Sequence, residues 1–240
     1  SWGALGRSWG ALGALLGCQG RSWELLAHSW GLFFCSFVRW FASWARRRPP
    51  IGSRVGSGSQ LGSNNDGHFC VCVSLHGGAA FGAVFHLAAD VSVTKSIEEP
   101  MTTLERNVAK TLKIAQACGT GKTRLVFSSS AAVYGRVDIR LPIKEEHTTR
   151  PTNPYGLSKL TCENWLETYR ELYDLDYVAL RYFNAFGERQ QGGSPYAGVI
   201  GNWMQAMHFK KPLVVYGDGA QTRDFVHVSD IVSANSKACL

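Results

Sequence analysis

Short apolar runs alternate with longer stretches of mixed polarity from about residue 83 onwards. Buried strands are predicted at 83–89, 124–129, 177–183 and 213–216, where the runs have strand length. Helices are predicted around 101–118, from Tyr155 to about Leu172, and near 197–209. Strands that alternate with helices are typical of an α/β fold with a doubly wound parallel sheet.

Ser130, Tyr155 and Lys159 are the most informative polar residues of this pattern. Tyr155 and Lys159 are four residues apart, so they share one face of a predicted helix. A cation beside a phenol favours the phenolate and lowers the phenol pKa, which makes a general base from a normally neutral group. The Ser130 hydroxyl can hold the same substrate oxygen. The three residues could remove a proton from a secondary alcohol while a cofactor takes the hydride.

The neighbours of these residues support a site. Pro154 is favoured at the first position of a helix, with Asn153 or Thr152 as its cap. The apolar run 124–127 leads into three serines, and ligands of open α/β sheets bind at the carboxyl ends of strands. Ser130 therefore falls where a site is expected. Tyr-x-x-x-Lys alone is a common spacing, and an ordinary exposed pair is the alternative interpretation.

Further stretches resemble, in order, motifs of one family. They are Val84–Ala89, Asn107, Leu180–Gly187, Val215–Gly219 and Thr222–Asp230. With the Ser–Tyr–Lys set, they make the chain resemble an extended short-chain dehydrogenase/reductase of the NAD-dependent epimerase/dehydratase type, most like the UDP-glucose 4-epimerases. The resemblance covers residues 83 to 240 and implies a Rossmann-like sheet with a smaller substrate domain.

The resemblance also implies cofactor and substrate residues. The cofactor would be NAD, the substrate a UDP-sugar, and the intact protein a cytoplasmic homodimer of galactose metabolism, without a metal. The implied catalytic residues are Ser130, Tyr155 and Lys159. The implied NAD-binding residues are Ala88, Ala89, Asn107, Ser128, Tyr155, Lys159 and Phe183. The implied substrate-binding residues are Ser130, Asn184 and Arg223.

The implied reaction inverts carbon 4 of the sugar. Tyr155 removes the proton of the 4-hydroxyl, Lys159 lowers the tyrosine pKa and holds the nicotinamide ribose, and Ser130 hydrogen-bonds the same oxygen. NAD takes the hydride, and the keto sugar turns and recovers it on its other face. Arg223 would fork onto the diphosphate.

Other residues near these motifs receive structural interpretations or bear on alternative functions. Asp224, His227 and Asp230 are expected to fix a loop and cap the following helix. A dehydratase or a decarboxylase of the same family is a second possible function. Dehydratases usually carry an acidic pair where this chain has Ala131 and Ala132, which argues against dehydration. A non-catalytic chain without a cofactor site is a third possibility.

Residues 1–82 differ from the rest of the chain. They contain seven arginines, no lysine and two acids, which gives +5 of the net charge of +7. They also lack the G-x-x-G-x-x-G turn that holds a dinucleotide. Their composition is typical of a GC-rich coding region read out of frame, through a frameshift, a misplaced start or an unspliced intron. We therefore expect residues 1–82 to be a disordered or mistranslated head, 83–190 a partial NAD-binding domain, and 191–240 the start of a truncated substrate domain.

Other patterns point to weaker alternatives. The apolar stretch 25–44, followed by three arginines, resembles a membrane anchor, although Arg39 and His28 inside it are costly. The basic head could attract nucleic acid, but no patterned basic face or recognised fold supports this. The segment 119–123 ends like a phosphate loop, but the first glycine of that motif is missing. The seven cysteines are read as free thiols of a reducing compartment, without zinc-site spacing.

Overall fold

The structure is a computed structural model in which residues 60–63, 69–73, 82–136, 142–188, 190, 192 and 198–239 are described. The strands are β1 (Gln60–Ser63), β2 (Phe69–Val73), β3 (Ala83–His86), β4 (Arg124–Ser130), β5 (Tyr177–Tyr182), β6 (Asn184–Phe186) and β7 (Phe225–His227). The helices are α3 (Val93–Glu98), α4 (Pro100–Thr103), the π-helical turn η1 (Leu104–Ala109), α5 (Lys110–Gly121), the 3-10 turn η2 (Ala131–Tyr134), α6 (Pro154–Tyr173), α7 (Val199–His208) and α8 (Val228–Ala238).

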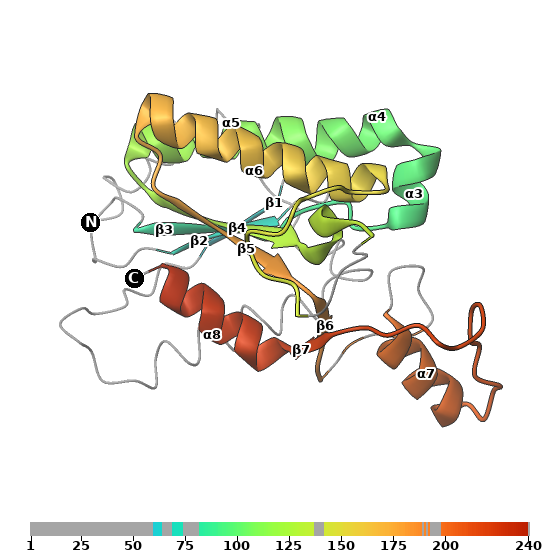
Figure 1. Cartoon of the computed structure of the whole chain (residues 1–240). Helices are drawn as coiled ribbons and strands as arrows, with labels where there is room; N and C mark the ends of the chain where they lie inside the picture. The colour runs from blue at the N-terminus through green and yellow to red at the C-terminus, as the bar shows by residue number, and fades with distance from the viewer. Residues whose placement is uncertain are drawn as a thin grey trace.

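The centre of the molecule is a parallel sheet with helices on both faces. β3, β4 and β5 pair in parallel within a sheet of order β1-β2-β3-β4-β5. Helices α5 and α6 lie side by side over one face, and α8 lies under the other (Figure 1). The predicted α/β fold with a doubly wound, Rossmann-like sheet is confirmed.

Alternation along the strands builds the two halves of the core. Leu125 and Phe127 of β4 pack in a cluster with Val84 and with buried residues of α5 and α6. Val126, which lies between them in sequence, packs with residues of β3 and with the end of α8. Successive strand side chains point to opposite faces, so an apolar run without polar interruption is buried on both. This is why 124–129 could be recognised as a strand from its sequence.

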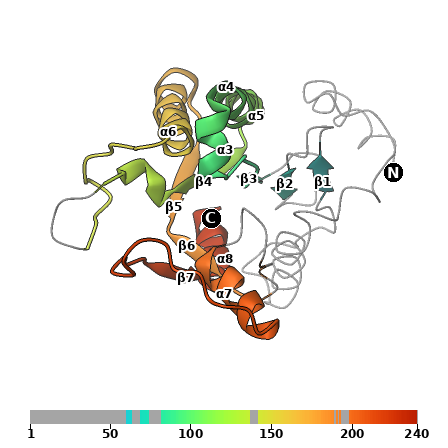
Figure 2. The ribbon, with the colours of Figure 1, turned by 90° about the vertical axis from the view of Figure 1, so that its right-hand side faces the viewer.

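The sheet continues into the segment that the sequence assigns to an unusual head. β2 pairs antiparallel with β3, and β1 pairs antiparallel with β2. Figure 2 shows both strands on the side of β3 away from β4. The run Phe69–Val73 is rich in β-branched and apolar residues, which favour strands, and it pairs with an edge of β3 that would otherwise be open. The predicted disordered or mistranslated head, residues 1–82, includes these two strands, where the structure shows order instead. Residues 1–59, 64–68 and 74–81 lie outside the described residues.

The C-terminal part departs from two sequence expectations. Residues 213–216 were predicted to be a strand, and this is wrong: they pair with no strand among the described residues, and their side chains are exposed. The strand of this region is β7, which pairs in parallel with β6. The segment 191–240 was assigned to a second domain, but α8 returns to the main sheet, where Ile231 and Val232 are buried near Tyr182 and Leu87.

Candidate active site

Ser130 stands at the carboxyl end of β4, as predicted. Its extended backbone makes it the N-cap of η2, and its Oγ accepts a hydrogen bond of 3.2 Å from the Ala132 amide. A hydroxyl that accepts from the backbone keeps its own proton to donate. Ser130 is half-buried, so its hydroxyl can be reached from the edge of the sheet.

Tyr155 is brought to Ser130 by the first turn of α6. Pro154 occupies the first helical position, and the Asn153 side chain caps the helix by accepting from the Gly156 amide at 2.8 Å. The Tyr155 amide donates to Ser96 Oγ of α3 at 3.2 Å. Burial raises the pKa of the Tyr155 phenol, and a side-chain hydrogen bond with Ser130 opposes the rise. The structure therefore brings the predicted serine and tyrosine into contact.

Lys159 lies one turn further along α6 and points to the same strand end. The side chain is buried, and Nζ donates to the Ser128 carbonyl at 2.7 Å. Nζ also lies 4.8 Å from the centroid of the Phe127 ring. Burial lowers the pKa of Lys159 to about 8, against the opposing effects of Cys162 and Glu163. The expected lowering of the Tyr155 pKa by Lys159 is absent in this structure, because burial of the phenol prevails.

Asn107 connects the loop after β3 to α6. Its Oδ1 accepts from the Asp90 amide at 2.7 Å, and its Nδ2 donates to the Asp90 carbonyl and to Ser158 Oγ at 3.0 and 3.1 Å. It stands in η1, and π-helical turns are often found at functional sites. The side chain is buried and engaged by protein groups, so in this structure it positions the loop that contains Ala88 and Ala89.

The remaining predicted cofactor residues border the same strand ends. Ala88 and Ala89 follow β3 directly and are half-buried. Ser128 is buried, and its Oγ lies 3.5 Å from Tyr182 Oη on the face that α8 covers. Phe183 follows β5 and is half-buried.

The pairing of β6 with β7 brings Asn184 next to the segment that contains Arg223. Asn184 Nδ2 donates to the Asp224 carbonyl at 2.8 Å, beside Arg223. The Arg223 guanidinium is exposed and donates to the Thr222 carbonyl at 2.8 Å and to Gln221 Oε1 at 3.1 Å. His227 caps α8 by accepting from the Ser229 amide, which confirms its capping role.

Several site neighbours were missed by sequence reasoning. Glu163, which is buried, and Arg181, which is half-buried, form an ion pair of 2.7 Å one helical turn beyond Lys159. Ser96 and Ser158 hold the first turn of α6. The spacing of Glu163, four residues after Lys159, was an available signal, because such residues share one helix face.

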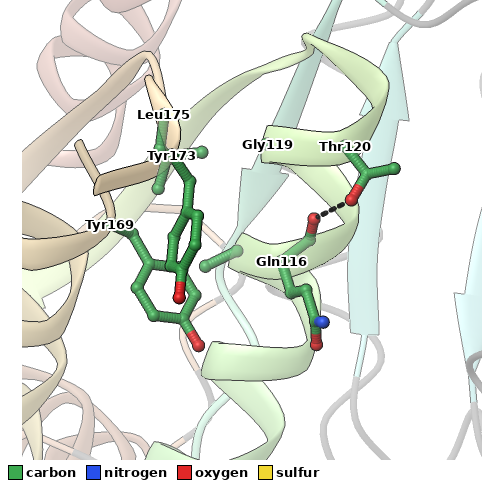
Figure 3. Close-up of a pocket in the computed structure, with 7 residues that line it drawn as sticks. Gln116, Gly119, Thr120, Tyr169, Tyr173 and Leu175 are labelled. Carbon is green, nitrogen blue, oxygen red and sulfur yellow. Dashed lines mark hydrogen bonds between the residues drawn. The ribbon is translucent and has the colours of Figure 1, made fainter. Parts of the chain in front are cut away.

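A pocket of about 360 Å³ lies at the other end of α5 and α6 (Figure 3). Its lining includes Gln116, Thr120, Tyr169, Tyr173 and Leu175. Tyr169 and Tyr173 stand in the last turns of α6, whereas Tyr155 and Lys159 stand in its first two. The pocket is therefore separate from the Ser–Tyr–Lys site.

Metal sites and membrane-spanning helices are absent from the described part of the chain. No group of three or more His, Cys, Asp or Glu residues there could hold a metal ion. None of the helices described is both long and apolar enough to cross a bilayer. The proposed anchor at 25–44 lies outside the described residues.

Two curated proteins show how the sequence relates to known enzymes. A "Putative UDP-glucose 4-epimerase" of Methanocaldococcus jannaschii is 40% identical over 157 residues, which are 65% of this chain and 51% of that protein. A UDP-N-acetyl-alpha-D-glucosaminuronate decarboxylase of Bacillus cytotoxicus is 37% identical over 158 residues, 65% of this chain and 49% of that protein. The chain thus spans about half the length of the curated relatives it matches.

Solved structures agree with the sequence matches. The UDP-N-acetylglucosamine 4-epimerase of Methanobrevibacter ruminantium, in complex with UDP-N-acetylmuramic acid, has a TM-score of 0.62 and 44% identity over 65% of this chain and 50% of that one. The UDP-glucose 4-epimerase of Brucella ovis, in complex with NAD, has a TM-score of 0.60 and 39% identity over 66% and 52%. The family model described as "NAD dependent epimerase/dehydratase family" matches residues 74–239. The chain belongs to this NAD-dependent epimerase/dehydratase family.

Proposed function

We propose that residues 74–239 carry the chemical centre of an NAD-dependent epimerase that inverts carbon 4 of a UDP-sugar. The observation that carries the proposal is the contact between Tyr155 and Ser130, with Lys159 buried one turn away against the same strand end. Family membership and the epimerases among the relatives support the choice of reaction.

In this proposal Tyr155 accepts the proton of the sugar 4-hydroxyl. Ser130 donates a hydrogen bond to the same oxygen, since its hydroxyl keeps its proton while it accepts from the Ala132 amide. Lys159, with a pKa of about 8, is mostly protonated at neutral pH and supplies positive charge next to the strand end. A keto sugar forms at carbon 4 and is reduced from its other face.

The residues at the strand ends fit the nicotinamide end of NAD. Ala88 and Ala89 are small and half-buried, which leaves room for a dinucleotide beside β3 and β4. When bound, NAD would supply the hydride acceptor and a positively charged ring that favours the phenolate. Residues Asn107, Ser128 and Phe183 would border it, and Lys159 would contact its ribose.

The nucleotide of the substrate would be held by Asn184 and Arg223. An exposed guanidinium can fork onto phosphate oxygens, and Arg223 lies two residues before β7, whose first residue, Phe225, pairs with Asn184. Anchoring the nucleotide while the sugar turns is what epimerisation requires.

A second candidate reaction is favoured by the decarboxylase relative. Decarboxylation would use the same tyrosine and lysine to form the keto sugar. Dehydration is disfavoured, because η2 presents Ala131 and Ala132 where an acidic pair would be needed.

Assembly and location follow from the family. We propose a homodimer for the complete enzyme, which sedimentation velocity would test. We propose a cytoplasmic location, which the free thiols of Cys162 and Cys239 support.

A chimaera tests the reaction. Residues 74–239 replace the matching segment of the Methanocaldococcus jannaschii relative, and the product is supplied with NAD and UDP-galactose. We expect UDP-glucose as the product. Release of carbon dioxide from a UDP-uronic acid, without interconversion of the two hexoses, would instead identify a decarboxylase. If the chimaera is inactive on both substrates, both assignments are contradicted.

A further inference from the structure

A buried carboxylate lies directly behind the candidate active site. Glu163 is 8% exposed and stands one turn after Lys159 on α6. The Ser129 hydroxyl donates to its Oε1. The Arg181 Nε donates to both carboxylate oxygens at 3.1 and 3.2 Å, and its second nitrogen donates to Oε2 at 2.7 Å. The carboxylate therefore has a serine and a forked guanidinium as partners.

Arg181 extends this contact to three further segments. It is the Cα partner of Ser129 in the pairing of β4 with β5. Its remaining nitrogen donates to Tyr134 Oη of η2 at 2.9 Å and to the Glu145 carbonyl at 3.0 Å. The Glu163–Arg181 pair thus joins α6, both strand ends, η2 and the loop near residue 145.

The segment held in this way contains both partners of the catalytic side chains. Ser129 lies between Ser128, whose carbonyl accepts from Lys159, and Ser130, which contacts Tyr155. Burying the Glu163 carboxylate costs desolvation free energy, which offsets much of its attraction to the half-buried Arg181. A role in fixing geometry explains why charge is placed here.

We propose that Glu163 is a positioning residue of the site, which holds the Ser128–Ser130 strand end against α6. This inference rests on the proposed function in treating the strand end as an active site. The measurements that test it need neither NAD nor a sugar. Glu163 touches neither Tyr155 nor Lys159 through a hydrogen bond that the structure records, so it acts through Ser129 and through its charge.

The surroundings of Lys159 support an electrostatic part of this role. Cys162 and Glu163 both raise the Lys159 pKa against burial. Burial raises the pKa of the Cys162 thiol to about 11, so the thiol is uncharged where Lys159 titrates. On the other elements Lys159 meets the Phe127 ring and the Ser128 carbonyl of β4, while His86 of β3 is bonded to Thr111. Among the described residues, Glu163 is the carboxylate that raises the Lys159 pKa.

The experiment uses the 240-residue chain without cofactor or sugar. Glu163→Gln is compared with Glu171→Gln, the same chemical change at an exposed position of the same helix. The Lys159 Cε–Hε resonance, assigned by its loss in Lys159→Met, is followed from pH 6 to 11 by NMR. We expect a midpoint near 8 in the wild type and in Glu171→Gln. In Glu163→Gln the midpoint should be lower than in both of these, with faster amide exchange at 128–134.

Equal midpoints in the two glutamine variants would overturn the proposal. Should Glu163→Gln fail to fold by circular dichroism, the double variant Glu163→Gln, Arg181→Met is used, since it leaves no unpaired charge. The double variant removes both charges together with the contact between α6 and the strand ends, so amide exchange at 128–134 should still be faster than in Glu171→Gln. Wild-type exchange at 128–134 in the double variant, or failure of both variants to fold, would overturn the positioning role. None of these readouts depends on NAD, so a failed epimerase assay leaves them separately interpretable.

Discussion

At the scale of single residues, the site depends on where charge is buried. Lys159 carries an ammonium group into a nearly closed environment and has one recorded hydrogen-bond acceptor, the Ser128 carbonyl. Burial prevails over its favourable neighbours, so its pKa falls to about 8 from 10.5. The residue can therefore be charged at neutral pH and still change its protonation in mildly alkaline solution.

Lys159→Met should change the pH dependence of stability. The folded state binds fewer protons than the unfolded state between about pH 8 and 10.5, so Lys159 makes the wild type more stable as pH rises through this window. Above pH 10.5 Lys159 is neutral in both states and costs no charge burial. As pH falls towards 8 the folded state must bury the charged ammonium group, and this part of the stability is lost. The free energy of unfolding of the wild type, relative to Lys159→Met, should rise by about 3 kcal/mol across the window. Urea unfolding at several pH values measures it.

The control for this experiment is Lys113→Met, at an exposed lysine of α5. Its unfolding free energies should run parallel to those of the wild type. If Lys159→Met also ran parallel, the buried cation would not have a lowered pKa, and the electrostatic account of the site would be wrong.

At the scale of elements, the sequence predicted what local patterns determine. The strand at 124–129 and the helix that begins at Pro154 could be predicted, because uninterrupted apolar residues, a proline and a capping asparagine are local signals. The strand at 213–216 was predicted wrongly, since an apolar run forms a strand only beside a partner, and β6 pairs with β7 instead. The Glu163–Arg181 pair could not be predicted, because it depends on the alignment of β4 with β5.

Gly156→Ala should weaken the junction between α6 and η2. A Cβ at this position would lie 2.7 Å from the Ala132 carbonyl oxygen and 3.1 Å from Pro151 Cβ. The better helix propensity of alanine, about 1 kcal/mol, is smaller than the usual cost of overpacking, about 1–3 kcal/mol. We expect a net loss of unfolding free energy in urea.

Gly119→Ala in α5 is the matched control. The nearest atom to its Cβ would be the Tyr173 carbonyl oxygen at 3.9 Å, an ordinary contact. This variant should be neutral or slightly stabilising. A Gly156→Ala protein as stable as Gly119→Ala would mean that the turn bearing Ser130 does not pack tightly on α6.

At the scale of the whole molecule, two parts of the chain differ in composition. The family model begins at residue 74, whereas the basic, lysine-free composition occupies the residues before it. β1 and β2 extend the family-like sheet by antiparallel pairing. These strands cover an edge of β3 that would otherwise present unpaired backbone groups.

Limited chymotrypsin digestion tests how far the sheet extends. The composition break predicts that cleavage removes the residues before β1, and pairing with β3 predicts that β2 is protected. Mass spectrometry should find a stable fragment that begins at or before residue 60. A fragment that begins at Leu75 or later would show that β1 and β2 do not hold to the sheet.

The 240-residue chain should bind NAD weakly. Dinucleotide pyrophosphates sit on the backbone amides of a glycine turn at a helix N-terminus, and the sequence contains no G-x-x-G-x-x-G. Losing several charge-assisted hydrogen bonds, about 1.5–3 kcal/mol each, reduces affinity by orders of magnitude. Calorimetric titration should give no micromolar site, and UDP-galactose should be converted hardly at all. Micromolar affinity with turnover would show that another segment supplies the phosphate site.

The most direct test of the proposed chemistry is Tyr155→Phe in the chimaera that carries residues 74–239. The variant removes only the phenol hydroxyl group, while Asn184 and Arg223 remain to hold the nucleotide. Turnover of UDP-galactose should fall by about 10²–10⁴-fold, the usual effect of removing a general base, and the affinity for the UDP-sugar should change little. Near-normal turnover in this variant would contradict the assignment of Tyr155, and with it the proposed function.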